Sequence, residues 1–500
     1  SLRENSTTEK IQNLHHGLEE EITLENGSDV TKKDLSKTEK DEIDVGGPII
    51  SSSAMESYVH LIDKEAPNEN PRHCIDDNMG CKEVKIQMNE DKDHTTSLLL
   101  FYQYIDPQWS DSLFKKVLAF VEGMGKKYNI TGRMRVAYEG LNCTLTGTYS
   151  NLRRWCRALR EYEDGKYFSK TEFKITDHLP KHQCFPKLHA FKVDELVNYG
   201  LAGHLTPSIT KTGKHLEPED YHLKMAEKDT VIIDVRNHYE SLIGHFSPPN
   251  NGAKYIDPNM RKSTEFPVWL DKPETKEMLR NKQVLMYCTG GVRCERASAL
   301  LQTKIENEED VKKLGIKGIY QLQGGIDKYF KKFPDGGWWK GKNYVFDKRN
   351  AHAPPIIEAL ENEARKVTKN EGEYSTTGGK LQIGSLTNPS IVPVIGMCEA
   401  CKKPWDRYKS KRRCPTCGVP SLICKECAGE LKIKGKSLGS TIRCDLCVNQ
   451  GITSKQQIKE KEIKELEDYR RERKVDMMAG KDNEDKRNDK ISVDKTRKVL

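Results

Sequence analysis

Residues 286–298 read MYCTGGVRCERAS and combine the residue types of a nucleophilic cysteine site. Cys288 ends an apolar run, and the following glycines let the backbone curl so that its N–H groups converge on the sulfur. These N–H groups, the start of a helix and the charge of Arg293 would lower the pKa of the thiol. The pattern predicts a catalytic pair, Cys288 and Arg293, whose sulfur is a thiolate or carries a persulfide. The predicted active loop also contains Thr289, Gly290, Gly291, Val292 and Cys294.

The composition and the length of this loop bear on two alternative interpretations. A buried cysteine that only ends a core strand is the more common case in general, but here the glycines and Arg293 fall where an anion site needs them. Thr289 to Val292 separate Cys288 from Arg293, one residue fewer than in cysteine-arginine phosphatases. The shorter loop favours a sulfane sulfur over a phosphate group.

Cys294 has two interpretations. In the first turn of a predicted helix its thiol could also have a lowered pKa, and it could resolve a persulfide or sulfenic acid on Cys288 as a disulfide. Alternatively, Cys294 is a small residue packed under the helix. The sequence leaves both interpretations open.

The elements that position this loop are short apolar strands alternating with helices. Residues 230–237 (TVIIDVRN), 283–288 (QVLMYC) and 318–325 (GIYQLQGG) are predicted strands, and their near-continuous apolar character indicates a sheet covered on both faces. Helices are predicted at residues 266–280, 293–304 and 326–333. The pattern predicts a doubly wound parallel sheet, in which reactive groups gather at the carboxyl ends of the strands.

A smaller α/β unit precedes this sheet. Residues 97–106, 131–149 and 172–179 are predicted strands, with helices within residues 107–128 and 152–162, which is compatible with a ferredoxin-like (acylphosphatase-like) domain. Several basic side chains of this domain could contact phosphates, although the last four could equally be a solvated helix face. They are Arg133, Arg135, Arg153, Arg154, Arg157 and Arg160.

Composition limits how much of the chain can fold. Apolar residues make up 35% and charged residues 32%, so only part of the chain can bury a core. The 83 Lys and Arg residues exceed the 75 Asp and Glu residues, and the net charge of +8 allows nucleic-acid binding without requiring it. No apolar run approaches the ~18 residues of a membrane span, and Glu19, Glu20 and Glu21 stand where a signal peptide would be apolar. We therefore expect a soluble protein without a membrane partner.

The changes in composition predict six segments along the chain. Those at both ends are polar and lack a sustained period, so we expect them to be disordered or solvated. The segments are 1–95, disordered; 96–200, the ferredoxin-like domain; 201–349, the parallel-sheet domain; 350–392, a linker; 393–451, a metal-binding module; and 452–500, a charged tail.

Eight of the 15 cysteines form four C-x-x-C pairs, which is a strong metal-ligand pattern and indicates a reducing compartment such as the cytoplasm. Eight thiolates make two four-cysteine sites, and zinc is the expected ion in a structural role. The pairing stays open between sequential sites and a cross-brace of first with third and second with fourth pair. A ring-type ubiquitin ligase fits poorly because the usual histidine is missing. The ligands are Cys398, Cys401, Cys414, Cys417, Cys424, Cys427, Cys444 and Cys447.

The loop at Cys288 resembles the active loop of the rhodanese family, whose cysteine carries a persulfide. The stretch DVRNHYESLIGHF, with Asp234, Arg236 and Glu240, is similar to the first rhodanese signature, and YQLQGGIDKYFKKFP is similar to the closing one. The resemblance implies that these acidic and arginine positions support the fold. His245 is expected to pack beside the turn rather than to act as a base.

The resemblance extends to the family of oxygen-dependent tRNA uridine-34 hydroxylases. The stretches AYEGLNCTLTG, FPKLHAFKVDELV, CTGGVRCE and FPDGGWWKGKNYVFDKR carry it, over about residues 97–349. One departure from the family is Cys143, at a position where the family has a glycine. Either the position is in a turn of positive φ, which a cysteine would strain, or it tolerates a side chain. The resemblance implies formation of 5-hydroxyuridine, with the tRNA anticodon region as partner and dioxygen as co-substrate.

Three functional hypotheses follow. In the first, the Cys288 thiolate adds to C6 of uracil and dioxygen then reacts at C5, while loop N–H groups and Arg293 stabilise the developing charge. Tyr138, Trp338 or Trp339 could stack on an exposed base. In the second, Cys288 is a sulfurtransferase residue that takes sulfur from a small donor such as thiosulfate and passes it to a thiol or cyanide. In the third, the chain is a catalytically silent zinc-module adaptor for RNA or protein. The flanking domains favour the first hypothesis.

Overall fold

The structure is a computed structural model that describes residues 95–347, 349–370, 394–409, 412–433 and 442–471. The predicted disorder of residues 1–94 and most of the predicted linker and charged tail lie outside these ranges. No helix among the described residues has the length and apolar character needed to cross a bilayer.

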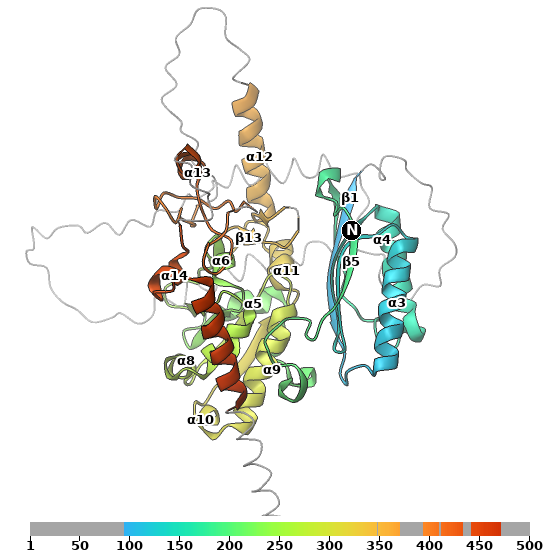
Figure 1. The fold of residues 1–500 in the computed structure, drawn as a ribbon, viewed down its shortest axis with the longest axis horizontal. Helices are drawn as coiled ribbons and strands as arrows, with labels where there is room; N and C mark the ends of the chain where they lie inside the picture. Colours follow the sequence, from blue (N-terminus) through green and yellow to red (C-terminus); the bar gives the residue numbers. More distant parts are fainter. Residues whose placement is uncertain (1–94, 348, 371–393, 410–411, 434–441, 472–500) are drawn as a thin grey trace, which may run out of the picture. The chain divides into compact units, whose positions relative to one another are not determined.

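The first domain is an α/β unit of the predicted acylphosphatase-like class, but its sheet has five strands where three were predicted, with two helices on one face (Figure 1). The strand order is β4-β1-β3-β2-β5, and the buried core includes Leu99, Phe101, Met134 and Trp155. The elements are β1 (Thr96–Tyr104), α3 (Asp111–Lys127), β2 (Thr131–Ala137), β3 (Gly140–Gly147), α4 (Tyr149–Glu161), β4 (Lys174–Leu179) and β5 (Leu188–Lys192).

The predicted single strand at residues 131–149 is a hairpin of β2 and β3. Gly140, at the hairpin turn, has φ 129°, and a Cβ there would lie 1.9 Å from the carbonyl oxygen of Gln103. Only glycine has this backbone conformation without a clash with the neighbouring strand. The chain therefore reverses direction at Gly140, within a sequence that otherwise reads as one strand. β5, which pairs in parallel with β2, was not predicted because it contains only two apolar positions facing the core.

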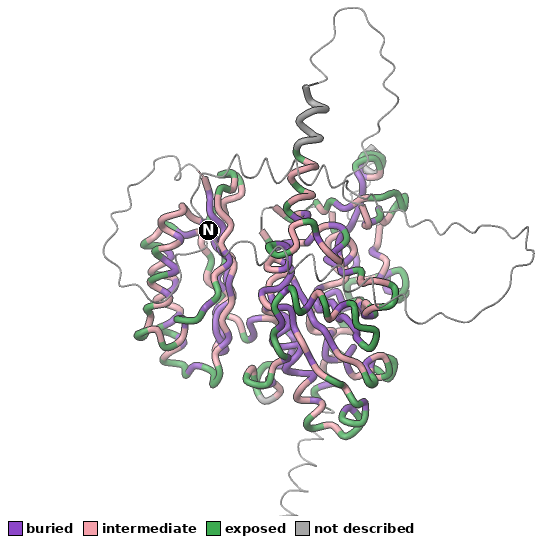
Figure 2. The backbone as a smooth tube through the Cα atoms, turned by 180° about the vertical axis from the view of Figure 1, so that it is seen from behind, coloured by how far each residue is buried: buried purple, intermediate pink, exposed green. Residues whose placement is uncertain are grey.

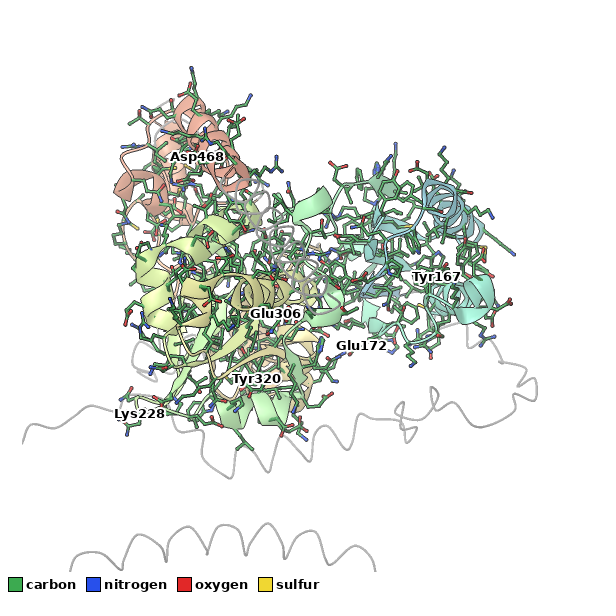
Figure 3. The ribbon with its side chains drawn as sticks, turned by 90° about the horizontal axis from the view of Figure 1, so that it is seen from below. Tyr167, Glu172, Lys228, Glu306, Tyr320 and Asp468 are labelled. Carbon is green, nitrogen blue, oxygen red and sulfur yellow. The ribbon has the colours of Figure 1, made fainter. Side chains whose placement is uncertain are left out.

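The second domain contains a parallel sheet, as predicted, and this sheet has five strands in the order β6-β11-β10-β7-β9. Alternate residues of β10 pack on opposite faces of the sheet. Val284 and Met286 lie in the core with α7 and α9, and Leu285 and Tyr287 lie in the core with α5 and α11. Figure 2 shows the buried residues running along these strands, and Figure 3 shows exposed side chains such as Lys228 and Glu306 on the surface. The strands are β6 (Lys214–Leu216), β7 (Thr230–Asp234), β9 (Lys254–Ile256), β10 (Gln283–Tyr287) and β11 (Gly318–Leu322).

The helices of this domain differ from the expectation in two ways. Helices at Pro218–Lys224, His238–Ser241 and Glu309–Lys312 were not predicted, and one predicted helix is divided. The predicted helix at residues 266–280 is two helices, because Lys272 precedes Pro273 and takes the extended ψ of 138° that a following proline favours. The strands β6 and β9 were missed because each has only three residues. The helices are α5 (Pro218–Lys224), α6 (His238–Ser241), α7 (Phe266–Asp271), α8 (Pro273–Leu279), α9 (Val292–Asn307), α10 (Glu309–Lys312) and α11 (Gly325–Lys332).

The C-terminal part packs on the parallel-sheet domain. Within the predicted linker, α12 (Pro355–Asn370) is helical, and within the predicted tail, residues 455–471 form a helix whose Tyr469 joins the core of the sheet domain. The short strands β8 (Gly244–Phe246) and β12 (Trp339–Gly341) pair, as do β13 (Asn343–Tyr344) and β14 (Ala351–His352). The cysteine module contains α13 (Lys425–Ile433) and α14 (Asp445–Asn449). The six predicted boundaries stay predictions.

Candidate active site

Cys288 directly follows β10, and the loop after it leads into α9. Gly291 is the N-cap of α9, with φ 100°, and a Cβ there would lie 2.8 Å from the hydroxyl of Tyr102. Gly290 does not have a left-handed φ, so the conformational freedom of glycine is required at Gly291. The turn directs the Gly291 N–H at the Cys288 Sγ, with an N–S distance of 3.1 Å.

The Cys288 thiol is ionised at neutral pH. Burial alone would raise its pKa, but the hydrogen bond from Cys294, the charge of Arg293 and the backbone N–H groups of Arg293 and Cys294 together lower the pKa to about 5. This is the thiolate cradle predicted from the sequence. It arises where a strand ends and a helix begins, so the unsatisfied N–H groups of the first helical turn face the sulfur.

The pKa gives a measurable expectation. Because the folded-state pKa is below that of a free thiol, the thiolate persists above about pH 6 and is protonated as the pH falls through about 5. The ultraviolet absorbance of the thiolate, taken as the difference between the wild-type protein and Cys288→Ser, should show this midpoint. Thiolates of the metal module cancel in the difference, and a midpoint near pH 8 or 9 would contradict the cradle.

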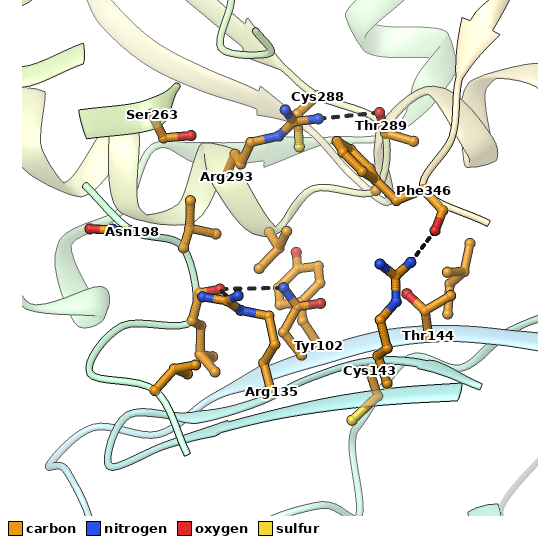
Figure 4. Close-up of a pocket in the computed structure, with 18 of the residues that line it drawn as sticks. Tyr102, Arg135, Cys143, Thr144, Asn198, Ser263, Cys288, Thr289, Arg293 and Phe346 are labelled. Atoms are coloured by element: carbon orange, nitrogen blue, oxygen red, sulfur yellow. Dashed lines mark hydrogen bonds between the residues drawn. The ribbon is translucent and has the colours of Figure 1, made fainter. Parts of the chain in front are cut away.

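A nucleophilic sulfur must be reached by its substrate, but the Cys288 side chain is not open to solvent in this structure. Cys288 is 0% exposed, although it lines the floor of a cavity. The guanidinium of Arg293 lies near Cys288, and the ring of Phe346 is 5.7 Å from that guanidinium (Figure 4). Because Cys288 is fully buried, a substrate atom can reach the sulfur only when a neighbouring side chain shifts.

Arg293 is held by a buried carboxylate. Its Nη1 and Nη2 donate to the two carboxylate oxygens of Glu240 at 2.6 and 2.9 Å, and Nη2 also donates to Thr289 Oγ1 at 3.3 Å. Glu240 lies in α6 and closes a capping box with Asn237, whose N–H donates to Glu240 Oε1 at 3.0 Å. The guanidinium is thus fixed beside the loop, and much of its charge is neutralised by Glu240.

The other signature pair is Asp234, the last residue of β7, and Arg236, and neither residue lines the cavity. Arg236 donates from Nε and Nη2 to the two oxygens of Asp234 at 2.8 and 2.6 Å, and Nη2 also donates to the Gly244 carbonyl at 2.7 Å. Tyr287 OH donates to Asp234 at 2.6 Å. The pair connects β7, β8 and β10 without touching Cys288. His245 stacks on Tyr255 and is likewise outside the cavity.

Cys294 lies beside Cys288 and is fully buried. The expectation of a lowered pKa was wrong for this residue: burial and the neighbouring Cys288 thiolate raise the pKa of the Cys294 thiol well above its ordinary value. Cys294 is therefore a protonated thiol that donates a hydrogen bond to the thiolate. The geometry brings the two sulfurs together, and both interpretations of Cys294 stay open.

A cavity of about 710 Å³ lies above Cys288, between the first domain and the parallel-sheet domain. Among the described lining residues the charges are almost all positive, since Asp347 is the one carboxylate and it pairs with Arg349 at 2.7 Å. The cationic lining residues are Arg133, Arg135, Lys174, Lys192, Lys262 and Arg293. The arrangement suits an anionic ligand about the size of a nucleotide.

Lys174 of β4 was missed by the sequence analysis. It is buried, and its Nζ donates to the carbonyl oxygens of Gly290 and Gly324, at 2.5 and 2.8 Å. Burial lowers the pKa of the Lys174 ammonium, and the carboxylates of Asp327 and Glu172 oppose that shift. A cation from the first domain thus holds two glycine turns of the parallel-sheet domain. A single lysine in a strand gives no sequence signal for this contact.

Removing that cation should weaken the cradle. We expect Lys174→Met to raise the pKa of Cys288 by about one unit, because a nearby positive charge is lost, and to slow any reaction of the thiolate at neutral pH. Lys174→Arg, which retains the charge, should restore part of the effect. The absorbance titration measures the shift, with the exposed Lys170→Met as control, and an unchanged midpoint would show that Lys174 has no electrostatic role.

The six arginines predicted to contact phosphates lie in different places in the structure. Arg133 and Arg135 line the cavity, whereas Arg153 pairs with Asp177 at 2.7 Å. Arg154 and Arg157 are exposed on α4, on the opposite side of the sheet. The remaining one, Arg160, donates to the Thr171 carbonyl at 3.2 Å.

None of the predicted stacking residues lines the cavity. Tyr138 stacks on Phe114 with ring centroids 4.6 Å apart, Trp338 stacks on His222, and Trp339 is buried in the sheet core. Their aromatic rings complete hydrophobic packing instead. The exposed aromatic side chains at the cavity are Phe191 and Phe346, 44% and 46% exposed.

Cys143 occupies a regular strand position. It lies in β3, paired with Phe101 and Met134 on either side, and its φ is not positive. Its sulfur points away from the cavity (Figure 4) and burial raises the pKa of the thiol. The position therefore tolerates a side chain, and the alternative of a strained turn was wrong.

The eight C-x-x-C cysteines form two tetrads in a cross-brace. Cys398 and Cys401 meet Cys424 and Cys427, and the other four cysteines form the second group. Within the tetrads, sulfur–sulfur distances of 3.6 to 3.9 Å match the ~3.8 Å edge of a tetrahedron with metal–sulfur bonds of ~2.3 Å. Each tetrad could hold one metal ion. The second tetrad contains Cys414, Cys417, Cys444 and Cys447.

The cysteine module also supports the site. His238 of α6 contacts Asp257 at 2.8 Å and Asp445 of the module at 2.9 Å, and the two carboxylates oppose the effect of burial and raise the pKa of His238 to about 10. Arg261 donates to the Cys447 sulfur at 3.6 Å. Because α6 also carries Glu240, the module braces the helix that fixes Arg293.

Three family models match the chain. They are a UPF0176 acylphosphatase like domain at residues 96–195, a rhodanese-like domain at residues 217–332 and a rhodanase C-terminal model at residues 340–448. The parallel sheet with a cysteine loop after its central strand defines the chain as a rhodanese-type protein. Full-length HypF, a solved structure, shares 16% identity over 26% of this chain with a TM-score of 0.15, a likeness too weak to bear on the fold.

The named proteins that are similar in sequence identify the family within the rhodanese-type proteins. The tRNA uridine(34) hydroxylase of Bacillus pumilus is 37% identical over 254 residues, 50% of this chain and 70% of the relative, and that of Lactococcus lactis subsp. cremoris is 36% identical over 256 residues, 51% and 71%. The chain belongs to the tRNA uridine(34) hydroxylase family. Rhodanese-like domain-containing protein 6 of Arabidopsis thaliana is 30% identical over 387 residues, 74% of this chain, and the chain spans 56% of that relative.

Proposed function

We propose that this chain hydroxylates carbon 5 of uridine 34 in the tRNA anticodon, with Cys288 as the nucleophile. The observation that carries the proposal is an ionised cysteine under a nucleotide-sized cavity with a cationic lining. A uridine turned out of the anticodon loop brings both a flat ring and adjacent phosphates, which suits this combination.

In the proposed reaction, the Cys288 sulfur bonds to C6 of the uracil ring and C5 becomes an enolate-like carbon. Dioxygen bonds to C5, and a thiol cleaves the resulting hydroperoxide to an alcohol. Loss of the C5 proton and of the Cys288 sulfur restores the ring double bond. Uridine, dioxygen and two thiols thus give 5-hydroxyuridine, water and a disulfide, so dioxygen is the oxidant and a thiol is the reductant.

The residues around Cys288 have separate proposed roles. The loop N–H groups and the start of α9 keep the sulfur ionised, and Arg293, fixed by Glu240, stabilises the charge that develops on the uracil carbonyl. Thr289, Gly290 and Val292 maintain the loop between them. Phe346, which lines the cavity, shields the thiolate from water until the substrate displaces its ring.

A sulfurtransferase is the second candidate. The short loop of four residues between Cys288 and Arg293 suits a persulfide, and a thiosulfate anion would fit the cationic cavity. The cavity is much larger than a small sulfur donor, which favours the first candidate.

The test uses the full chain, an unmodified tRNA transcript with uridine at position 34, a thiol reductant and dioxygen labelled with heavy oxygen. Nucleoside mass analysis should find 5-hydroxyuridine containing one heavy oxygen atom. Unlabelled product would reject dioxygen as the source. Unchanged uridine together with sulfur transfer from thiosulfate to cyanide would select the second candidate.

We also propose that both tetrads hold structural zinc and that the protein acts in the cytoplasm, where thiols stay reduced. Backbone N–H groups donate to the thiolates, from Cys424 to Cys398 at 3.3 Å and from Cys444 to Cys414 at 3.4 Å, as around metal-bound sulfur.

The cross-brace predicts a particular pattern of zinc loss. Wild-type protein should contain two zinc ions per chain; Cys398→Ser with Cys424→Ser should remove one, and Cys398→Ser with Cys414→Ser should remove both. Sequential pairing predicts the reverse for the two double variants. Elemental analysis of the purified variants distinguishes the two schemes, and zinc contents that do not differ between them would contradict independent tetrads.

A further inference from the structure

One face of the first sheet has no helix of its own domain over it. At β1 this face meets α9, where Tyr102 donates to Glu295, and β2 and β5 lie beyond that contact in the strand order. On β2, Met134 and Val136 point into the core with α3 and α4, so Arg133 and Arg135 point to the other side. On β5, Leu188 and Ala190 pack on the same core, so His189 and Phe191 point with the arginines. We call these four outward residues, Arg133, Arg135, His189 and Phe191, the open sheet face.

The aromatic residues of this face already form a stack. The rings of His189 and Phe191 lie 5.8 Å apart at an interplanar angle of 14°, and Phe191 is 44% exposed. β5 is an edge strand, so these rings stand at a free border of the sheet. An exposed, parallel pair of flat rings is a platform for a further flat ring, because stacking tolerates any base.

The basic residues lie next to the platform and keep hydrogen-bonding capacity. Arg133 donates to the Phe346 carbonyl and lies 5.3 Å from the Phe185 ring, and Arg135 donates to the carbonyls of Leu196 and Glu195 at 3.1 and 3.2 Å. These bonds use part of the five N–H groups of each guanidinium. Neither arginine pairs with a carboxylate in the described part of the chain, so their charges are available to an anion.

The open sheet face and the catalytic cavity are continuous. Arg133, Arg135 and Phe191 line the same cavity as Cys288. An anionic strand that crosses the face therefore leads directly to the sulfur.

We propose that the open sheet face binds the single-stranded RNA of the anticodon loop, with a base next to the target uridine stacked on Phe191 and His189 and its phosphate held by Arg133 and Arg135. The inference rests on the proposed function and adds the site that presents the substrate. The charge of the cavity and the flat exposed rings favour RNA over an acidic peptide, which has no bases to stack.

The test measures binding of a labelled anticodon stem-loop to the full-length Cys288→Ser protein by fluorescence anisotropy, so that no turnover occurs. Phe191→Ala should weaken binding about tenfold, because one base loses its stacking partner, and Phe191→Trp should restore it. Arg133→Ala should weaken binding. It should also reduce the slope of log affinity against log salt concentration by about one, the contribution of one phosphate contact.

The matched control is Arg154→Ala with Arg157→Ala, which removes positive charge from α4 on the far side of the sheet. We expect it to bind the stem-loop within about twofold of the parent. Equal losses in this control and in Arg133→Ala would show non-specific attraction and overturn the inference. Unchanged binding of Phe191→Ala, or displacement of the RNA by an equal concentration of an acidic peptide, would also overturn it.

The two proposals can fail separately. Stem-loop binding that depends on Phe191 and Arg133, in a wild-type protein that forms no 5-hydroxyuridine, would keep the RNA site and reject the hydroxylation. Hydroxylation that persists at the wild-type rate in Phe191→Ala and Arg133→Ala would keep the reaction and reject the site.

Discussion

Replacing Cys288 with serine is expected to abolish formation of 5-hydroxyuridine, with a fall in rate of at least about a thousandfold. The cradle lowers the pKa of a thiol to about 5, but a serine hydroxyl starts far higher and stays protonated in the same loop. A neutral hydroxyl cannot add to C6 of uracil at a comparable rate. Single-turnover reactions of the purified variant with a tRNA transcript measure the loss.

Two controls separate chemistry from folding. Cys156→Ala changes another buried cysteine, on α4 and outside the cavity, and should keep the wild-type rate. Cys294→Ser retains a hydrogen-bond donor beside Cys288; full multiple-turnover activity in this variant would favour a packing role, and activity limited to one turnover would favour a resolving thiol. Product formed by Cys288→Ser at near the wild-type rate would contradict nucleophilic catalysis.

Of the substitutions considered in the parallel-sheet domain, Asp234→Ala should lower the free energy of unfolding the most. It leaves the guanidinium of Arg236, which is completely buried, without its carboxylate, and it removes the acceptor of Tyr287 OH. Loss of one partner of a buried ion pair costs about 3–5 kcal/mol. Urea unfolding followed by tryptophan fluorescence should show a corresponding fall in the free energy of unfolding of this domain.

The matched control for this prediction is Glu277→Ala, which breaks an exposed pair with Arg280 at 2.9 Å. Exposed pairs contribute about 0–1 kcal/mol, so the control should unfold almost like the wild type. Similar small effects of both substitutions would mean that Arg236 finds water or another acceptor, and that the pair does not hold β7, β8 and β10 together.

The geometry of the loop at Cys288 could be predicted because its determinants are close in sequence. The end of a strand, the glycine at position 291 and the first turn of a helix form the cradle within a few residues, so local chemistry specifies it. The split between α7 and α8 also had a local signal, Pro273, which the apolar spacing of residues 266–280 obscured.

The rest of the site depends on contacts that sequence spacing does not encode. Lys174 meets Gly290 across 116 positions, and Tyr102 donates to Glu295 across 193, so neither residue has a neighbour in sequence that reveals its role. The pairing of the metal ligands was undecided for the same reason: sequential and crossed schemes use identical C-x-x-C spacings. The fold of the module, through Cys398 near Cys424, decides between them.

The most direct measurement of the central claim is mass analysis of wobble nucleosides in tRNA from cells that lack this protein. We predict that 5-hydroxyuridine is lost, that the wild-type chain restores it, and that the chain with Cys288→Ser, present at equal level, does not. Unchanged 5-hydroxyuridine in the deficient cells, or full restoration by the serine variant, would contradict the account.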